Sequence, residues 1–116
     1  MESVLKTKSY AFAIRIVRLT QYLHTEKTEY ILSKQVIRSG TAIGALLREA
    51  EFGESTNDFI HKITIALKEA NETEYWLSLL HDTDYIENKL FMSLQSDCKE
   101  LIAMLVSSVK TLKTKK

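Results

Sequence analysis

The chain has 116 residues, a formal net charge of +1, three glycines, one cysteine and no proline. This length fits one domain with a substantial core, and the scarcity of chain breakers predicts long helices. The single cysteine excludes an internal disulfide framework, and no apolar run approaches the ~20 residues of a membrane span. The first ten residues lack the apolar segment of a signal peptide, so we expect a cytoplasmic protein without membrane contact.

The first predicted helix, residues 8–24, has two apolar faces. Steps of three and four place one set of side chains on a single face: Phe12, Ile16, Leu19 and Leu23. A second apolar set lies nearly opposite: Tyr10, Ala13, Ile14 and Val17. Such a helix must be covered twice, by its own bundle and by something else.

The second predicted helix, residues 29–52, contains Gly40 and Gly44 in its interior, where each glycine costs roughly 1 kcal/mol relative to alanine. Its apolar stripe comprises Leu32, Val36, Ile43, Leu47 and Ala50. With Ser33, the two glycines form a strip of small residues, which predicts close approach by another helix. A glycine-induced bend is the alternative. Gly53 is expected to end the helix in a left-handed conformation.

The third predicted helix, residues 56–81, is expected to begin with Ser55 as its cap and Asp58 as a weak capping-box partner. Its apolar stripe comprises Phe59, Ile63, Ala66, Ala70 and Leu77. Ile65, Trp76 and Leu80 lie away from that stripe. Glu74 falls on it, so we expect a salt bridge to Arg38 or Arg48. A misphased helix and a catalytic carboxylate are the alternatives.

The fourth predicted helix, residues 88–112, carries a heptad-like seam: Phe91, Leu94, Cys98, Leu101, Leu105, Ser108 and Leu112. A basic tail from about residue 110 is expected to fray. Four helices joined by short polar turns predict an all-α fold, an antiparallel up-down-up-down four-helix bundle that forms a single domain over residues 1–116.

Residues that carry chemistry do not converge in the sequence. The three histidines, His24, His61 and His81, include only one neighbour pair, Asp58–His61, that resembles half of a di-iron site. Cys98 lies within the apolar seam, where we expect it to pack as a small hydrophobe. There is no glycine-rich phosphate loop and no nucleophile motif. We therefore expect no metal, no cofactor and no enzymatic activity.

Charge is unevenly distributed along the chain. Residues 1–48 carry a net charge of +5, residues 49–87 carry −8 and residues 88–116 carry +4. The asymmetry either steers subunits together or leaves a basic surface for phosphates. The candidate nucleic-acid-binding residues are Lys6, Lys8, Arg15, Arg18, Lys110, Lys113, Lys115 and Lys116. Lysine-rich ends that only improve solubility are the simpler interpretation.

The central block from "LSKQVIRSGTAIGALLREAEFG" to "IALKEANETEYWLSLL" resembles the bacterial 23S rRNA intervening-sequence proteins. The likeness extends to "SYAFAIRIVRLTQYL" before the block and "CKELIAMLVSSVKTLK" after it, and "RSGTAIGA" and "IALKEANETEYWL" are its most specific parts. Leu46 stands where many members have asparagine, which puts any role of that polar residue in doubt here.

The resemblance implies a four-helix bundle and a homo-oligomer, with a ring of five subunits, and does not imply an enzyme. A similar bundle serves as an accessory protein to reverse transcriptases, although shared fold is weak evidence of shared function. The leading hypothesis is a non-enzymatic, oligomeric protein associated with RNA or DNA. The alternative is an oligomeric scaffold for a protein partner such as a reverse transcriptase, and an enzyme ranks third.

Overall fold

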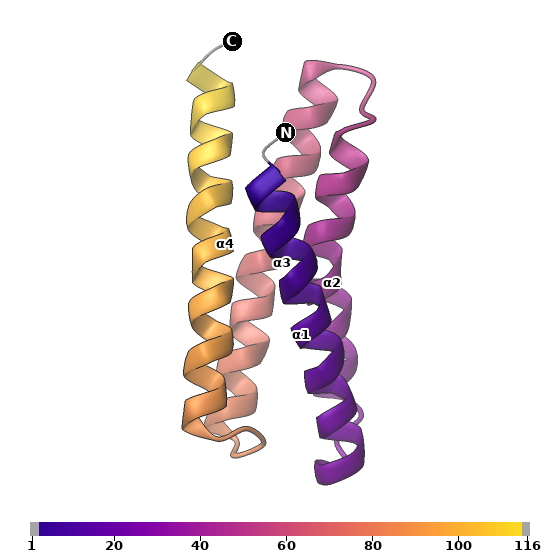
Figure 1. The fold of residues 1–116 in the computed structure, drawn as a ribbon, viewed down its shortest axis with the longest axis vertical. Helices are drawn as coiled ribbons and strands as arrows, with labels where there is room; N and C mark the ends of the chain where they lie inside the picture. The colour runs from indigo at the N-terminus through magenta and orange to yellow at the C-terminus, as the bar shows by residue number, and fades with distance from the viewer. Residues whose placement is uncertain (1–2, 115–116) are drawn as a thin grey trace.

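The structure, a computed structural model, describes residues 3–114 and consists of four helices in that range, with no strand. The helices are α1 (Ser3–Lys27), α2 (Leu32–Ala50), α3 (Thr56–Asp82) and α4 (Asn88–Thr114). Each helix runs antiparallel to the one before it, and both chain ends lie at the same end of the molecule (Figure 1). The predicted all-α four-helix bundle is confirmed.

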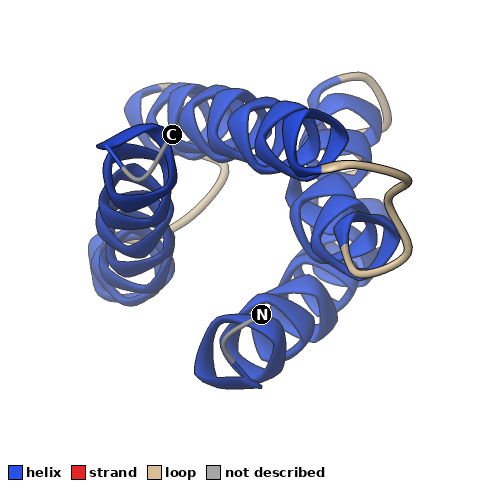
Figure 2. Cartoon of the chain, turned by 90° about the horizontal axis from the view of Figure 1, so that it is seen from above, coloured by secondary structure: helices blue, strands red, loops and turns tan. Residues whose placement is uncertain are grey.

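Each helix packs mainly against its neighbours in the sequence. The contacts between α2 and α3 are the most extensive, and those between α1 and α4 are the least. Seen from above, α1 and α4 form the two arms of an open arrangement that α2 and α3 connect (Figure 2). The α1–α4 side is therefore the most weakly closed side of the bundle.

All four helices contribute to one apolar core. Its fully buried large side chains are Leu5, Phe12, Ile16, Leu23, Ile43, Leu47, Ile63, Leu77, Leu80, Leu94, Leu101 and Leu105. The four apolar residues predicted for the first face of α1 are all buried. Leu80, which the sequence pattern places away from the main stripe, is wholly buried, so this part of the prediction is wrong. Its turn of α3 lies beside the α3–α4 connection, where Ile86 is also buried.

The helix boundaries depend on specific side chains. Glu29 lies outside α2, and its carboxylate accepts hydrogen bonds from the backbone N–H groups of Ile31, Leu32 and Ser33 at 3.0, 2.7 and 2.8 Å. These are N–H groups that a helix start otherwise leaves without partners. α2 therefore begins at Leu32 and not at residue 29. At the start of α3, Ser55 accepts a hydrogen bond from the Asp58 N–H at 3.0 Å, which confirms the predicted cap.

The conformation predicted for Gly53 is wrong, because none of the three glycines has a positive φ. α2 ends at Ala50, and the Gly53 N–H donates to the Ala50 carbonyl at 3.1 Å. A Cβ at Gly53 would lie 2.6 Å from the Asp58 carboxylate, so the glycine leaves room for that side chain.

The last helix is longer than the sequence pattern predicts. α4 runs to Thr114, whereas the pattern places a frayed tail from about residue 110.

Candidate interaction surfaces

The two interior glycines of α2 lie where α2 crosses α1. A Cβ at Gly40 would lie 2.9 Å from Cγ1 of Ile16, and a Cβ at Gly44 would lie 3.3 Å from Oγ of Ser9. Ser33, on the same strip, is buried and its hydroxyl lies 3.1 Å from Nε2 of His24. Close packing against α1 therefore accounts for the two glycines.

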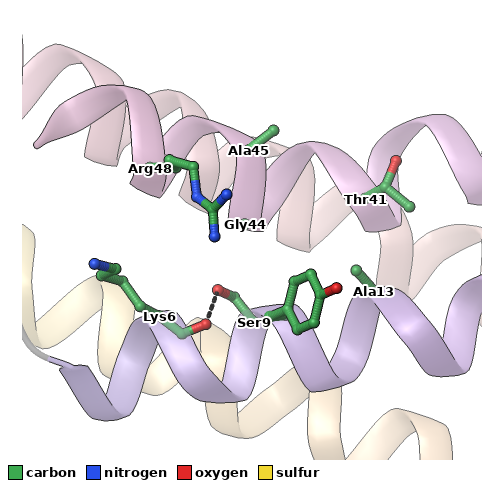
Figure 3. Close-up of a pocket in the computed structure, with 8 residues that line it drawn as sticks. Lys6, Ser9, Ala13, Thr41, Gly44, Ala45 and Arg48 are labelled. Carbon is green, nitrogen blue, oxygen red and sulfur yellow. Dashed lines mark hydrogen bonds between the residues drawn. The ribbon is translucent and has the colours of Figure 1, made fainter. Parts of the chain in front are cut away.

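Beside Gly44, the surface between α1 and α2 is hollowed into what we call the α1–α2 groove, with a volume of about 340 Å³. Its lining consists of Lys6, Ser9, Tyr10, Ala13, Thr41, Gly44, Ala45 and Arg48. Figure 3 shows Lys6 and Arg48 at one end and Ala13 and Thr41 at the other. The groove thus has a basic end and a small, largely apolar floor.

The second apolar face of α1 borders this groove and is uncovered in the single chain. The Tyr10 side chain is 63% exposed, and Ile14 and Val17 are also exposed. Large apolar side chains grouped on one helix face are uncommon on monomers and mark interaction sites. Among the exposed apolar side chains that sequence reasoning did not single out, Phe52, in the α2–α3 connection, is the most exposed, at 80%.

Three of the candidate nucleic-acid-binding residues on α1 contact carboxylates. Lys6 pairs with Glu51, next to α2, while Lys8 and Arg15 reach across to α4. Nζ of Lys8 lies 3.3 Å from Glu100, and the Arg15 guanidinium lies 2.8 Å from Asp97. The Lys8–Glu100 and Arg15–Asp97 pairs bridge the α1–α4 side, where helix contacts are fewest, and they reduce the net positive charge there.

The remaining candidates have fewer contacts. Arg18, Lys110 and Lys113 are exposed and form no ion pair within residues 3–114. Arg18 and Arg15 line a hollow of about 330 Å³ between α1 and α4, together with Leu19, Tyr22, Leu90 and Leu94. Lys110 and Lys113 lie near the end of α4, at the end of the molecule where α1 begins (Figure 1). Lys115 and Lys116 lie outside the described residues.

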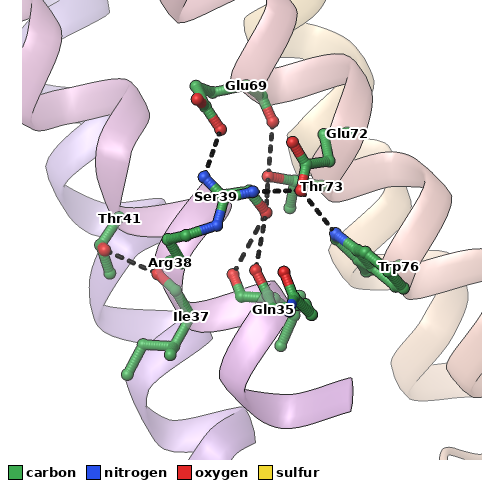
Figure 4. A network of polar contacts seen from close by, with 10 residues as sticks. Gln35, Ile37, Arg38, Ser39, Thr41, Glu69, Glu72, Thr73 and Trp76 are labelled. Atoms are coloured by element: carbon green, nitrogen blue, oxygen red, sulfur yellow. Dashed lines mark hydrogen bonds and ion pairs between the residues drawn. The ribbon is translucent and has the colours of Figure 1, made fainter. Parts of the chain in front are cut away.

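Arg38 does not pair with Glu74, and this prediction is wrong. Its guanidinium contacts Glu69 at 3.3 Å and also Glu72, both on α3 (Figure 4). Glu72 accepts a hydrogen bond from Nε1 of Trp76 at 2.9 Å. The Trp76 hydrogen bond and the Arg38 contact both hold the pKa of Glu72 below its ordinary value. The hydrogen bond from Arg38 to Glu72 in turn raises the pKa of Arg38.

Glu74 instead lies 3.7 Å from the ammonium group of Lys99 on α4. The buried seam of α3 passes through Thr73, one residue earlier, so Glu74 is only half-buried. Its side chain faces α4 and not α2. The Thr73 hydroxyl donates to Oγ of Ser39 at 2.9 Å, a buried polar contact between α2 and α3. Arg48, the other predicted partner, forms no ion pair with Glu74 and lines the α1–α2 groove.

Metal-ligating side chains do not cluster in the described part of the chain. No set of three or more His, Cys, Asp or Glu side chains within residues 3–114 is placed to hold a metal ion. Cys98 is buried and its thiol donates to the Ala70 carbonyl at 3.3 Å. Burial, reinforced by the nearby Glu74 and Asp97 charges, raises the pKa of Cys98 to about 12. None of the described helices is long and apolar enough to cross a membrane.

The family model for the 23S rRNA-intervening sequence protein matches residues 2–107. The chain belongs to this family. One solved structure that is similar to it is described as a protein with unknown function from the S23 ribosomal protein family of Bacteroides thetaiotaomicron VPI-5482. That protein is 52% identical, covers 91% of this chain over 98% of its own length, and superimposes with a TM-score of 0.90. A comparison with curated proteins finds no match.

Leu46, where family resemblance leads us to expect asparagine, lies at the edge of the core. Leu46 is partly buried and packs against the apolar cluster. An apolar side chain at this position contributes to packing, which explains why the bundle accepts it.

Proposed function

We propose that this family member is a non-catalytic, self-associating helical protein that binds RNA through the phosphate backbone. The observation that carries the proposal is a basic row on α1, formed by Lys8, Arg15 and Arg18, which lies along the side facing α4. Spacings of seven and three residues keep these side chains on one helix face. Lys110 and Lys113, with Lys115 and Lys116 beyond them in the sequence, add charge toward the chain end.

The carboxylates that contact this basic row do not rule out phosphate binding. The Lys8–Glu100 and Arg15–Asp97 pairs are open to solvent, and such surface pairs contribute only about 0–1 kcal/mol each. A phosphate group can therefore displace a carboxylate at small cost. Phosphate recognition is independent of sequence and releases bound counterions, which provides much of the affinity for nucleic acids. The family description names 23S rRNA, which makes RNA the first probe to use.

Self-association rests on the uncovered face of α1. Tyr10, Ile14 and Val17 remain exposed although the opposite face of the same helix is fully buried. Five subunits, the number that family resemblance implies, is part of the proposal. Light scattering at micromolar concentration should give a mass well above the 13.3 kDa of one chain, and a monomer mass would contradict this part.

Fluorescence anisotropy with a labelled fragment of ribosomal RNA tests the RNA-binding part. Affinity should fall with salt, with a log–log slope of about −0.7 for each phosphate contacted on single strands. Arg15→Gln and Arg18→Gln should weaken binding to all sequences about equally, because phosphate contacts do not read bases. The matched control is Lys68→Gln, which removes one exposed cation from the acidic helix α3 and should change affinity little.

Removing the neutralising carboxylates gives the converse test. Asp97→Asn and Glu100→Gln should strengthen RNA binding, because Arg15 and Lys8 then lose their competing partners. A merely solubilising role for the cations predicts no gain. If the wild-type protein binds no RNA or DNA at low salt while a protein co-purifies with it, the alternative function as a protein scaffold replaces this proposal.

A further inference from the structure

We infer that two copies of this chain contact each other by inserting Phe52 of one copy into the α1–α2 groove of the other. This inference rests on the self-association in the proposed function and names the surfaces that perform it. Phe52 is a large aromatic side chain that is 80% exposed in the turn after α2. Buried aromatic anchors of this kind dominate the energy of many interfaces.

The groove offers a matching site. Its volume of about 340 Å³ leaves room for an aromatic ring, and Ala13, Gly44 and Ala45 provide a floor of small side chains. Tyr10 forms one wall, and the exposed side chains of Ile14 and Val17 continue the apolar surface along α1. A copy that seats its Phe52 here would cover the face of α1 that the single chain leaves open.

Charge selects a second copy as the occupant. Arg48 and Glu54 both border a hollow beside Phe52 in their own chain, yet neither side chain forms an ion pair within residues 3–114. Arg48 also lies at the basic end of the groove. Inserting Phe52 brings Glu54 of one copy toward Arg48 of the other. Complementary charges at the rim of an interface set its register and disfavour wrong partners. The acidic α2–α3 connection and the basic groove thus form the two halves of one contact.

The positions of these features also suit contact between identical chains. Arg48 and Phe52 are four residues apart at the end of α2, so the basic end of the groove lies about one helical turn from Phe52 along the bundle, and the floor at Gly44 lies about one turn further. An axial offset of about two turns between copies would place Phe52 over that floor. Copies can therefore pack side by side with their bundle axes parallel. This arrangement extends the contact along α1, which is needed because a stable interface buries roughly 800 Å² on each partner.

The decisive experiment measures assembly of charge-reversed chains by analytical ultracentrifugation or native mass spectrometry. Arg48→Glu alone and Glu54→Arg alone should each raise the concentration for half-assembly at least tenfold, because like charges then face each other. Mixing the two variants should restore contact between unlike chains, since the carboxylate introduced at position 48 of one chain then meets the guanidinium introduced at position 54 of the other. Two variants cannot alternate around a ring of five, so the rescue is read as mixed pairs and even-numbered assemblies and not as the closed ring. A contact within one chain cannot produce this rescue, so failure of the mixture to assemble would overturn the inference.

A second set of variants tests the inserted ring. Phe52→Ser should raise the half-assembly concentration at least tenfold, whereas the control Ile31→Ser removes another exposed apolar side chain at the opposite end of α2 and should not. Circular dichroism should show that both variants keep their helices. If the wild type is oligomeric and the Phe52→Ser variant assembles as well as the wild type, the inference is refuted, while the proposal of self-association still stands. A monomeric wild type refutes self-association itself.

Discussion

Gly40 shows how a residue unfavourable to its own helix serves the packing between helices. Its missing side chain lets Ile16 of α1 reach the α2 backbone, and Ile16 is fully buried. A β-branched side chain at that position has few alternative rotamers, so it cannot easily move aside. Gly44 differs, because its nearest neighbour is the small Ser9 hydroxyl at the border of the groove.

We expect Gly40→Ala to lower the free energy of unfolding by about 1 kcal/mol. Overpacking costs about 1–3 kcal/mol, and the better helix propensity of alanine returns up to ~1 kcal/mol. Urea denaturation measures the difference. Gly44→Ala is the matched control and should have a smaller effect, since its Cβ meets Ser9 at 3.3 Å and not the branched carbon atoms of Ile16. A more stable Gly40→Ala variant would show that α1 is not held against this residue.

Cys98 should be unreactive in the folded protein. With its pKa raised from 9.0 to about 12, its thiolate fraction at pH 8 falls about a thousandfold. Labelling by a thiol reagent should accordingly be at least about a hundredfold slower than in urea. The folded state keeps the thiol proton between about pH 9 and pH 12 while the unfolded chain loses it, so this group reduces stability as pH rises above about 9. Fast labelling under native conditions would contradict the buried position.

At the scale of the elements, the connection between α1 and α2 depends on one side chain. Thr28 has a positive φ of 47°, an unfavourable conformation for a β-branched residue, and the carboxylate of Glu29 then turns onto the start of α2. Glu29 itself is buried, and its backbone carbonyl accepts from the Ser33 hydroxyl at 3.0 Å. The turn is therefore fixed by the contacts of Glu29.

Glu29→Ala should lower the free energy of unfolding by about 1–2 kcal/mol, the usual loss for a helix cap. The N–H groups of Ile31, Leu32 and Ser33 lose their common acceptor in this variant. Glu26→Ala, one turn earlier on the exposed end of α1, is the control and should change stability by less than ~0.5 kcal/mol. Thermal unfolding followed by circular dichroism measures both, and equal midpoints would argue against the cap.

The sequence predicts the helices well because the apolar period repeats over many turns. It predicts their ends less well, since a glutamate such as Glu29 reads equally well as a helix residue or as a cap. The rotation of each helix about its own axis is even harder to predict from the sequence. In the structure, Thr73 and not Glu74 lies on the buried seam of α3, so the Glu74 side chain points toward Lys99 and not toward Arg38. An error of one residue in the predicted rotation of the helix is therefore enough to change the ion pair. Phe52 lies in a turn and belongs to no periodic pattern, so the candidate contact was not predictable from the sequence.

For the molecule as a whole, α1 contributes to two different surfaces. Tyr10 and Ala13 border the α1–α2 groove, whereas Lys8, Arg15 and Arg18 lie toward α4. In our proposal, RNA binding and self-association therefore use separate faces of one helix. Repeating the basic row in an oligomer would raise avidity without strengthening any individual contact.

This separation predicts that the two activities can be removed independently. Arg15→Gln with Arg18→Gln should weaken RNA binding and leave the oligomer mass unchanged. Phe52→Ser should instead yield smaller assemblies whose RNA affinity falls only by the loss of avidity, so that a short RNA spanning one subunit binds as before. Light scattering and anisotropy on the same samples provide both readings. Loss of assembly in the arginine variants would mean that the basic row belongs to the subunit contact.

The sparse contact between α1 and α4 has a consequence for how fast the chain reaches its native state. Nearly all helix packing joins neighbours in the sequence, so little of the structure waits for the two chain ends to meet. Helical proteins of such low contact order fold in microseconds to milliseconds. The absence of proline also removes the isomerisation that delays many proteins by tens of seconds. Refolding followed by Trp76 fluorescence, at concentrations too low for assembly, should therefore finish within milliseconds in one exponential phase, and a phase lasting seconds would contradict this expectation.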